Sequence, residues 1–284
     1  MLGSLIKQYT SCNLIKKNEF KFERKININK KVFVIGVILI GIIVVTFYNI
    51  SLNGKTEEIE ITQDFSNVEV ESENANINVI ASNNNTAKAE LVNNKNNKYK
   101  LDVKVDGNTL EIEVNRRGFK WLSIDFFSNS PTLNLMLPEK VAGTIALETN
   151  NGTISASNLE SKEMAAESDN GEILIENVKS NSIYAQSDNG ELFFENLEGE
   201  ILGESDNGDI TLVNDSLNQP IEFETDNGSI IIQTKKEPEN VKMDVYTDNG
   251  TINIFGKSNE STVIGNGENL IKLTSDNGDI IVEK

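Results

Sequence analysis

The chain has 284 residues and a formal net charge of −18, with no histidine and a single cysteine, Cys12. The lack of histidine excludes the usual general base, the Ser/His and Cys/His nucleophile pairs, and histidine-containing zinc sites. Strong acidity argues against nucleic-acid binding by the part of the chain after residue 50, so we expect neither an enzyme nor a nucleic-acid partner.

The N-terminal part of the chain has the organisation of a membrane anchor. Residues 1–31 carry eight Lys or Arg against two Glu, a net charge of +6, whereas 32–50 carry no charge and are apolar enough for a short transmembrane helix. Basic residues before the span and a net charge of −24 after it predict a cytoplasmic N-terminus and an extracytoplasmic C-terminal domain. We expect an uncleaved single-pass anchor in the cell membrane, followed by a connector at 51–57. A cleaved signal peptide is the alternative, but no small-x-small cleavage site supports it.

The region 58–148 alternates apolar and polar residues in short runs, which is typical of β-strands. The apolar positions of these runs are Ile59 and Ile61, Val68 and Val70, Ile77 and Val79, Ala89 and Leu91, Leu101 to Val105, Leu110 to Val114, and Leu133 and Leu135. We expect this region to be an irregular β cap that protects one end of a longer repeat. An aromatic cluster inside it, Phe119, Trp121, Phe126 and Phe127, is expected to plug that end, or alternatively to form an exposed patch for a partner.

The region 149–284 repeats one tetrapeptide, Thr-Asn-Asn-Gly once and Ser/Thr-Asp-Asn-Gly six times. The turn residues of the seven copies are Asn151 and Gly152, Asn170 and Gly171, Asn189 and Gly190, Asn207 and Gly208, Asn227 and Gly228, Asn249 and Gly250, and Asn277 and Gly278. Successive glycines are 18 to 28 residues apart, a period that indicates stacked repeats. Alternating apolar residues on both sides of each turn predict two half-buried strands per copy, and only Gly203 places no side chain inward. We expect the Asn-Gly pairs to supply the positive φ angles of a sharp turn.

Two topologies fit this alternation, a meander of hairpins and a coil. An open meander of so many strands would leave one apolar face uncovered, whereas a coil closes over its own interior. We therefore predict an all-β fold, a single-stranded β-solenoid similar to a parallel β-helix. In this fold each copy is stacked on the copy before it, at about 4.8 Å per rung.

Stacking in register would bring one aspartate per copy into a single column. The column comprises Asp169, Asp188, Asp206, Asp226, Asp248 and Asp276. Repulsion between neighbours about 5 Å apart is under about 1 kcal/mol in water, so the column requires no metal ion. We interpret these residues as turn formers whose side chains accept backbone N–H bonds, and not as catalytic residues. They are weak candidates for a divalent cation such as calcium, which needs six or more converging oxygens.

Several segments resemble a known family. The strand pair EIEITQDFSNVEVESENANINVI, the segment LNLMLPEKV, and the turns ETNNGTI and SDNGEI are similar to the bacterial putative-adhesin family of β-strand repeats, which includes LiaG-like envelope proteins. The resemblance covers residues 56–284. It implies a fold and a compartment and brings no catalytic residues, because this family is a domain of unknown function.

The anchor and the resemblance together predict an adhesion, binding or scaffold module of the bacterial cell envelope, with an envelope protein or glycan as partner. One alternative is an envelope-stress accessory protein that contacts membrane partners through residues 1–50. Another, from the enzyme class, is a polysaccharide-acting solenoid with paired carboxylates.

Overall fold

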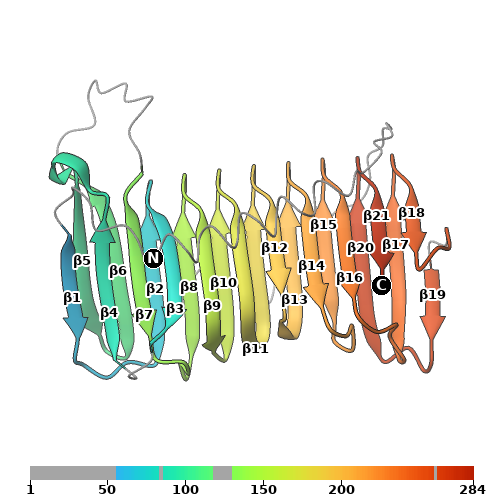
Figure 1. Ribbon diagram of the computed structural model, residues 1–284, viewed down its shortest axis with the longest axis horizontal. Helices are drawn as coiled ribbons and strands as arrows, with labels where there is room; N and C mark the ends of the chain where they lie inside the picture. Colours follow the sequence, from blue (N-terminus) through green and yellow to red (C-terminus); the bar gives the residue numbers. More distant parts are fainter. Residues whose placement is uncertain (1–55, 83–85, 118–129, 259–260) are drawn as a thin grey trace.

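The computed structural model describes residues 56–82, 86–117, 130–258 and 261–284. The basic segment 1–31, the expected anchor 32–50 and the aromatic cluster within 118–129 lie outside the described residues. No helix in the described part of the chain is long and apolar enough to cross a membrane. Strands lie side by side along the long axis of the molecule, which is an elongated rod (Figure 1).

The described residues form a sheet of 21 strands and one short 3-10 helix at Lys95–Asn97. In chain order the strands are β1 (Glu57–Ile61), β2 (Asn67–Ser72), β3 (Asn76–Ala81), β4 (Ala87–Val92), β5 (Tyr99–Asp106), β6 (Thr109–Arg116), β7 (Thr132–Leu137), β8 (Thr144–Thr149), β9 (Ile154–Glu160), β10 (Glu163–Ser168), β11 (Ile173–Ser187), β12 (Leu192–Glu195), β13 (Glu198–Ser205), β14 (Ile210–Asn214), β15 (Ile221–Thr225), β16 (Ile230–Thr234), β17 (Val241–Thr247), β18 (Ile252–Ile254), β19 (Ser261–Ile264), β20 (Asn269–Ser275) and β21 (Ile280–Glu283).

Parallel pairing arranges these strands into two walls. The first wall contains β6, β2, β8, β10, the second half of β11, β13, β15, β20 and β17. The second wall contains β7, β3, β9, the first half of β11, β12, β14, β16, β21 and β18. Ile173 pairs with Leu192, which pairs with Ile210, and all three are buried between the walls. The predicted parallel solenoid is therefore confirmed, and the meander is wrong.

The rungs do not stack in chain order at the two ends of the rod. The last rung, β20 and β21, lies between the rung of β15 and β16 and the rung of β17 and β18. At the other end, β2 and β3 lie between β6–β7 and β8–β9. The expectation that every rung rests on the preceding rung is thus wrong for β8–β9, which rests on β2–β3, and for β17–β18, which rests on β20–β21. The 28-residue step before the last glycine includes β19, and this extra length lets the chain pass one rung and return into the gap.

Antiparallel strands cover both ends of the stack. β5 pairs with β6, β4 lies between β1 and β7, and β19 pairs with β17. Residues 58–148 therefore supply cap strands and also two parallel rungs of the solenoid, β2–β3 and β6–β7. Such caps reduce edge-to-edge association of the rods, because they pair with the outermost strands. β18, the last strand of the second wall, pairs with β21 and otherwise has only the isolated bridge between Ile254 and Lys257 among the described residues.

The core between the walls combines large and small side chains. The buried rings of Phe194 and Phe223 are stacked with their centroids 5.4 Å apart and their planes 8° from parallel. A Cβ atom at Gly203 would lie 3.0 Å from Phe223 Cδ1 and 3.1 Å from Phe194 Cε2. The space that a side chain at Gly203 would take is thus filled by two rings. Phe223 comes from the next rung of the same wall, and Phe194 comes from the opposite wall.

This packing predicts different effects for two adjacent phenylalanines. Phe194→Ala should lower the free energy of unfolding by about 3–5 kcal/mol, because it leaves a cavity in the core. Phe193→Ala removes a side chain from the outer face, and should lower it by less than about 1 kcal/mol. Chemical denaturation of the two variants measures the difference, and equal losses would contradict the assignment of the two faces.

The insertion of the last rung predicts that a substitution in β21 destabilises strands that come earlier in the sequence. Ile280→Asp places a charge inside β21, which separates β16 from β18, so amides of β17 and β18 should lose hydrogen-exchange protection although they precede the substitution. Ile281→Asp, on the outer face of the same strand, is the matched control and should leave that protection in place. A loss confined to β21 would speak against the inserted rung.

Candidate functional site at the Asp-Asn-Gly edge

The seven tetrapeptides form one long edge of the rod, where each rung passes from the first wall to the second. Each side-chain Nδ2 donates to the Oδ1 of the asparagine one rung away at 3.0 to 3.2 Å. In spatial order this asparagine ladder comprises Asn74, Asn151, Asn170, Asn189, Asn207, Asn227, Asn277 and Asn249. Six of the amides also donate to a backbone carbonyl of the neighbouring rung. The amides therefore serve the fold, because most of their hydrogen-bonding capacity is already used.

The Ser or Thr that opens each tetrapeptide forms a second line of hydrogen bonds inside the corner. Its hydroxyl donates to a backbone carbonyl one rung away at 2.8 to 3.2 Å. These donors are Thr149, Ser168, Ser187, Ser205, Thr225, Ser275 and Thr247. A small hydroxyl residue is required here because the site is largely buried and faces a carbonyl.

The glycines of the tetrapeptides are needed for space. A Cβ atom at any of the seven would lie 1.8 to 2.1 Å from the carbonyl oxygen one rung away, usually that of the neighbouring glycine. None of the seven has a positive φ, and neither do the preceding asparagines. The expectation that the Asn-Gly pairs provide positive φ angles is therefore wrong. Glycine is required at these positions because the rungs approach so closely that no side chain fits.

One further copy of the turn is degenerate and was not predicted from the sequence. Ser72, Glu73, Asn74 and Ala75 form the corner between β2 and β3, and the amide of Asn151 donates to Asn74 Oδ1. The Ser72 hydroxyl accepts from the backbone N–H groups of Asn74 and Ala75. Alanine replaces glycine at this end of the ladder, and the pattern Ser-Glu-Asn-Ala could have been found as a degenerate copy.

The opposite edge has its own repeated turn, which was not predicted either. Asn158, Asn177 and Asn196 adopt left-handed backbone conformations with φ of 52° to 59°. Each is followed by a residue buried in the core, Leu159, Val178 or Leu197. The 19-residue spacing of Asn-Leu or Asn-Val was the available signal. Asparagine suits this position because its side chain tolerates the left-handed region better than most residues.

The turn aspartates form the predicted column, but in a different order. Asp276 lies between Asp226 and Asp248, and burial together with repulsion from these two neighbours raises the pKa of the Asp276 carboxyl. Among the hydrogen bonds of the described residues, none has a turn aspartate accepting a backbone N–H, so that expected role is wrong. Asp209 and Asp279, which follow the glycine of their own copies, accept backbone N–H groups of the next rung instead.

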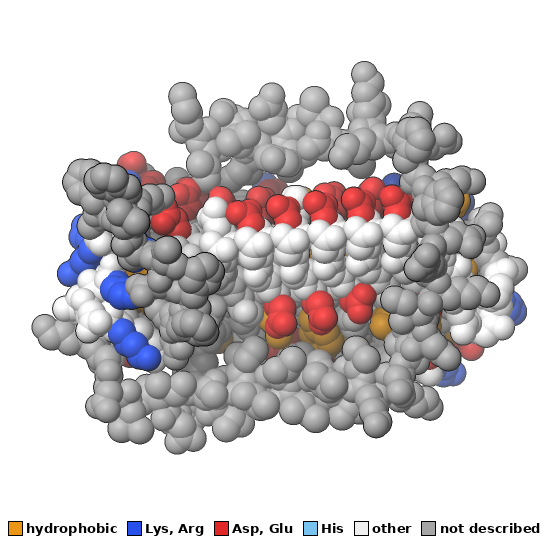
Figure 2. Space-filling model, turned by 90° about the horizontal axis from the view of Figure 1, so that it is seen from above, with side chains coloured by type: hydrophobic (Ala, Val, Ile, Leu, Met, Phe, Trp, Pro, Cys, Tyr) orange, Lys and Arg blue, Asp and Glu red, His pale blue; other side chains and the backbone are white. Residues whose placement is uncertain are grey.

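The Asp-Asn-Gly edge presents carboxylates on both sides of the asparagine ladder (Figure 2). A shallow groove of about 380 Å³ follows the ladder and is bordered by Glu172, Glu191 and Asp209. Burial, then repulsion from Asp209 and Glu172, raises the pKa of Glu191. In the described part of the chain no three acidic or thiol side chains converge as metal ligands would, so calcium at this edge stays a proposal without a site.

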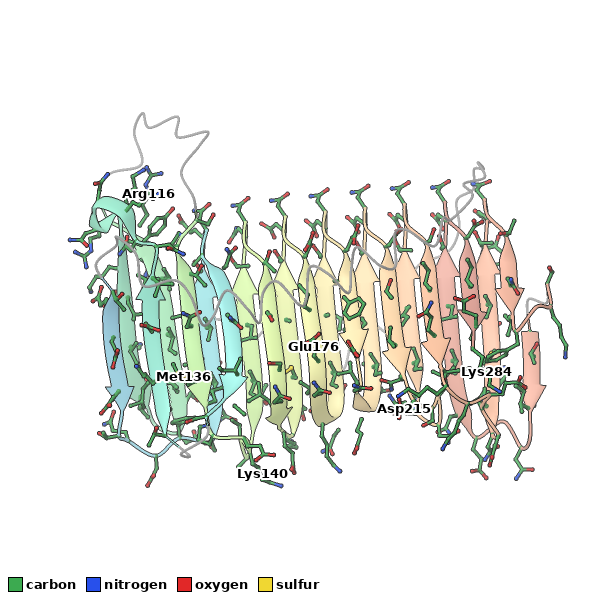
Figure 3. The ribbon with its side chains drawn as sticks, in the orientation of Figure 1. Arg116, Met136, Lys140, Glu176, Asp215 and Lys284 are labelled. Carbon is green, nitrogen blue, oxygen red and sulfur yellow. The ribbon has the colours of Figure 1, made fainter. Side chains whose placement is uncertain are left out.

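A further column of glutamates covers the outer face of the first wall. Its members, with one glutamine, are Glu113, Glu71, Glu148, Glu167, Gln186, Glu204 and Glu224. Burial is the main cause that raises the pKa values of Glu71, Glu167 and Glu204, and repulsion within the column adds to it. Across from it, Glu176 lies on the outer face of the second wall, whereas Lys140 and Asp215 lie at the edge opposite the Asp-Asn-Gly turns (Figure 3).

The spatial role of the glycines can be tested with asparagine, which tolerates a positive φ. Gly190→Asn and Gly190→Ala should both destabilise the protein, by about 3 kcal/mol or more, because either Cβ meets the Gly171 carbonyl oxygen. Gly107 has a φ of +61°, and a Cβ atom added there would meet nothing within 4 Å, so Gly107→Asn should cost less than about 1 kcal/mol. Thermal unfolding compares the three variants, and a well-tolerated Gly190→Asn would restore the φ explanation.

The glutamate column makes stability depend on pH. Because the folded state raises the pKa of Glu167, folding binds the proton more tightly, so stability should rise as the pH falls through this raised pKa towards the ordinary glutamate value of 4.5 and decline as the pH rises. Glu167→Gln should stabilise the protein at pH 7 by up to about 1 kcal/mol and reduce this dependence. Glu237→Gln, at an exposed loop position, is the control, and melting curves across this pH range give the result.

Comparison with known proteins identifies the family of the chain. Solved structures similar to the chain include a putative adhesin from Bacteroides fragilis, at 14% identity and a TM-score of 0.46, over 82% of this chain and 98% of that one. A putative cell adhesion protein from Clostridium sporogenes aligns at 14% identity and a TM-score of 0.35, over 81% of this chain and 99% of that one. No curated protein matches the chain. Two stretches, 65–203 and 199–283, match the Toastrack DUF4097 family, a family of unknown function, and the protein therefore belongs to it.

Proposed function

We propose that the protein is a membrane-anchored, extracytoplasmic binding or scaffold module of the bacterial cell envelope. The observation that carries the proposal is the rod itself, whose first wall and Asp-Asn-Gly edge present acidic side chains in most rungs. A rigid surface with a repeat of about 4.8 Å is suited to holding partners along its length.

Features of the amino-acid sequence support the location. The uncharged segment 32–50 follows a basic segment with a net charge of +6, and this polarity favours a cytoplasmic N-terminus. The exported part then contains no cysteine and no histidine, so its stability depends on the stacked rungs rather than on disulfides. The surface carboxylates attract cationic groups over about one Debye length, roughly 8 Å at physiological salt.

The topology can be tested with thiol labelling, because Cys12 is the single native thiol. In intact cells a membrane-impermeant maleimide should leave Cys12 unlabelled until the membrane is permeabilised. Asn218→Cys in a Cys12→Ser background places a thiol in the exposed loop between β14 and β15, and should be labelled at once. Labelling of Cys12 in intact cells, or recovery of the Asn218→Cys variant in the medium, would exclude the anchor as proposed.

Binding can be tested by capture from solubilised envelope membranes with the full-length chain as bait. We expect the same envelope protein or glycan to be retained with and without a chelator, since the aspartate column needs no metal ion. A triple variant of the first wall, Glu148→Gln, Glu167→Gln and Glu204→Gln, should reduce retention if the acidic face is used. Release by the chelator would instead indicate calcium-dependent binding, and turnover of a glycan would support the enzyme alternative.

A further inference from the structure

The outer face of the second wall carries a line of apolar side chains that the core does not use. This apolar stripe consists of Leu174, Phe193, Ile231 and Ile281, in neighbouring rungs except where Thr211 stands between Phe193 and Ile231. None of the four belongs to the core cluster between the walls. Leu174, at one end of the stripe, is buried with 6% of its surface exposed, whereas Phe193, Ile231 and Ile281 are half-buried. All described strands belong to the walls or their end caps, so no described strand lies over this face.

Carboxylates border the apolar stripe on both sides. Side chains two residues before the stripe include Glu172, Glu191 and Asp209, and those two residues after it include Glu176 and Glu195. Because alternate residues of a strand share a face, each row lies about 6.6 Å from the stripe. In Figure 2, acidic side chains lie beside hydrophobic ones on this side of the edge. Burial and repulsion from Glu195 raise the pKa of Glu176, which shows the crowding of charge along the row.

We propose that this face binds a cationic amphipathic α-helix, which lies along the axis of the rod with its apolar side on the stripe and its Lys or Arg residues over the two acidic rows. The proposal rests on the binding function proposed above and names the chemistry of the partner. Charge complementarity selects a basic partner, and the apolar centre selects one with a hydrophobic face. An anionic lipid surface is disfavoured, because both rows would repel it.

The spacing of the stripe distinguishes a helix from an extended strand. Successive stripe residues are about 4.8 Å apart, whereas the turns of a helix are 5.4 Å apart and alternate residues of a strand about 6.6 Å apart. After three steps a helix is out of register by about 1.8 Å and a strand by about 5.4 Å. From Phe193 to Ile281 the accessible part of the stripe covers three rung steps, about 14 Å, which corresponds to about 10 residues of helix.

The test uses the full-length chain in nanodiscs of zwitterionic lipid and a dye-labelled helix of about 14 residues built from Leu and Lys. Phe193→Thr with Ile231→Thr alters the stripe and keeps strand-forming side chains, since Thr211 already occupies the same column. We expect this variant to weaken binding about tenfold or more in fluorescence anisotropy. Leu202→Thr, a half-buried outward position on the first wall, is the matched control and should change the Kd less than about twofold.

The charge requirement is tested in the same assay. Glu191→Gln with Glu195→Gln should weaken binding at low salt and reduce its salt dependence, whereas Glu237→Gln with Glu239→Gln, in the exposed loop between β16 and β17, should not. Equal weakening by both pairs, or equal binding of a scrambled Leu/Lys peptide, would mean unspecific attraction to the acidic surface and would overturn the proposal.

Two further results would assign the stripe to another occupant and overturn the proposal. One is a dimer of the wild-type chain that Phe193→Thr with Ile231→Thr converts to a monomer in analytical ultracentrifugation. The other is stripe-dependent binding to peptide-free lipid vesicles. Circular dichroism melting verifies that each variant is folded. If the peptide fails to bind while envelope capture still retains a partner, the helix site alone is wrong and the binding function remains supported.

Discussion

The rod depends on the close approach of successive rungs at the Asp-Asn-Gly corner. The glycines let neighbouring rungs approach so closely that an added Cβ atom would overlap a carbonyl oxygen. A Cβ atom at Gly190, for example, would lie 2.0 Å from the carbonyl oxygen of Gly171. This contact allows the asparagine amides and the Ser or Thr hydroxyls to bond one rung further along, so each corner positions the next. Two walls of strands are then held in register, and their inward residues form one continuous core.

In-register stacking has opposite consequences inside and outside the rod. Inside, apolar residues pack on apolar residues of the neighbouring rungs. Where one rung has a smaller residue, larger neighbours fill the space, as the rings of Phe194 and Phe223 do at Gly203. Outside, the same register places glutamates over glutamates, and burial with mutual repulsion raises the pKa of Glu167 and Glu204. The fold tolerates this repulsion because each pair costs little in water, and the resulting acidic surface is what a cationic partner would recognise.

The ends of the rod are closed by changes of chain order and direction. A rung that comes early or late in the sequence is inserted between two others, which gives its strands parallel partners on both sides. Antiparallel strands cover the outermost β6 and β7, and β19 covers β17 at the other end. Terminal segments thus contribute to the stability of the stack, and the exposed surfaces remain those of the walls and the long edges.

The sequence by itself determined the strands, the inward positions and the parallel solenoid, because alternation and a repeated turn are local signals. It did not reveal the reason for the glycines, the degenerate turn at Ala75, the left-handed Asn177, or the place of β20 between β15 and β17. The alternation placed Ile230 and Ile232 inward, but it did not show that the outward Ile231 aligns with Phe193 and Ile281 on neighbouring rungs. These features are decided by contacts between rungs that are far apart in the chain: only the tertiary structure shows which backbone atoms meet and which apolar side chains are left outside the core.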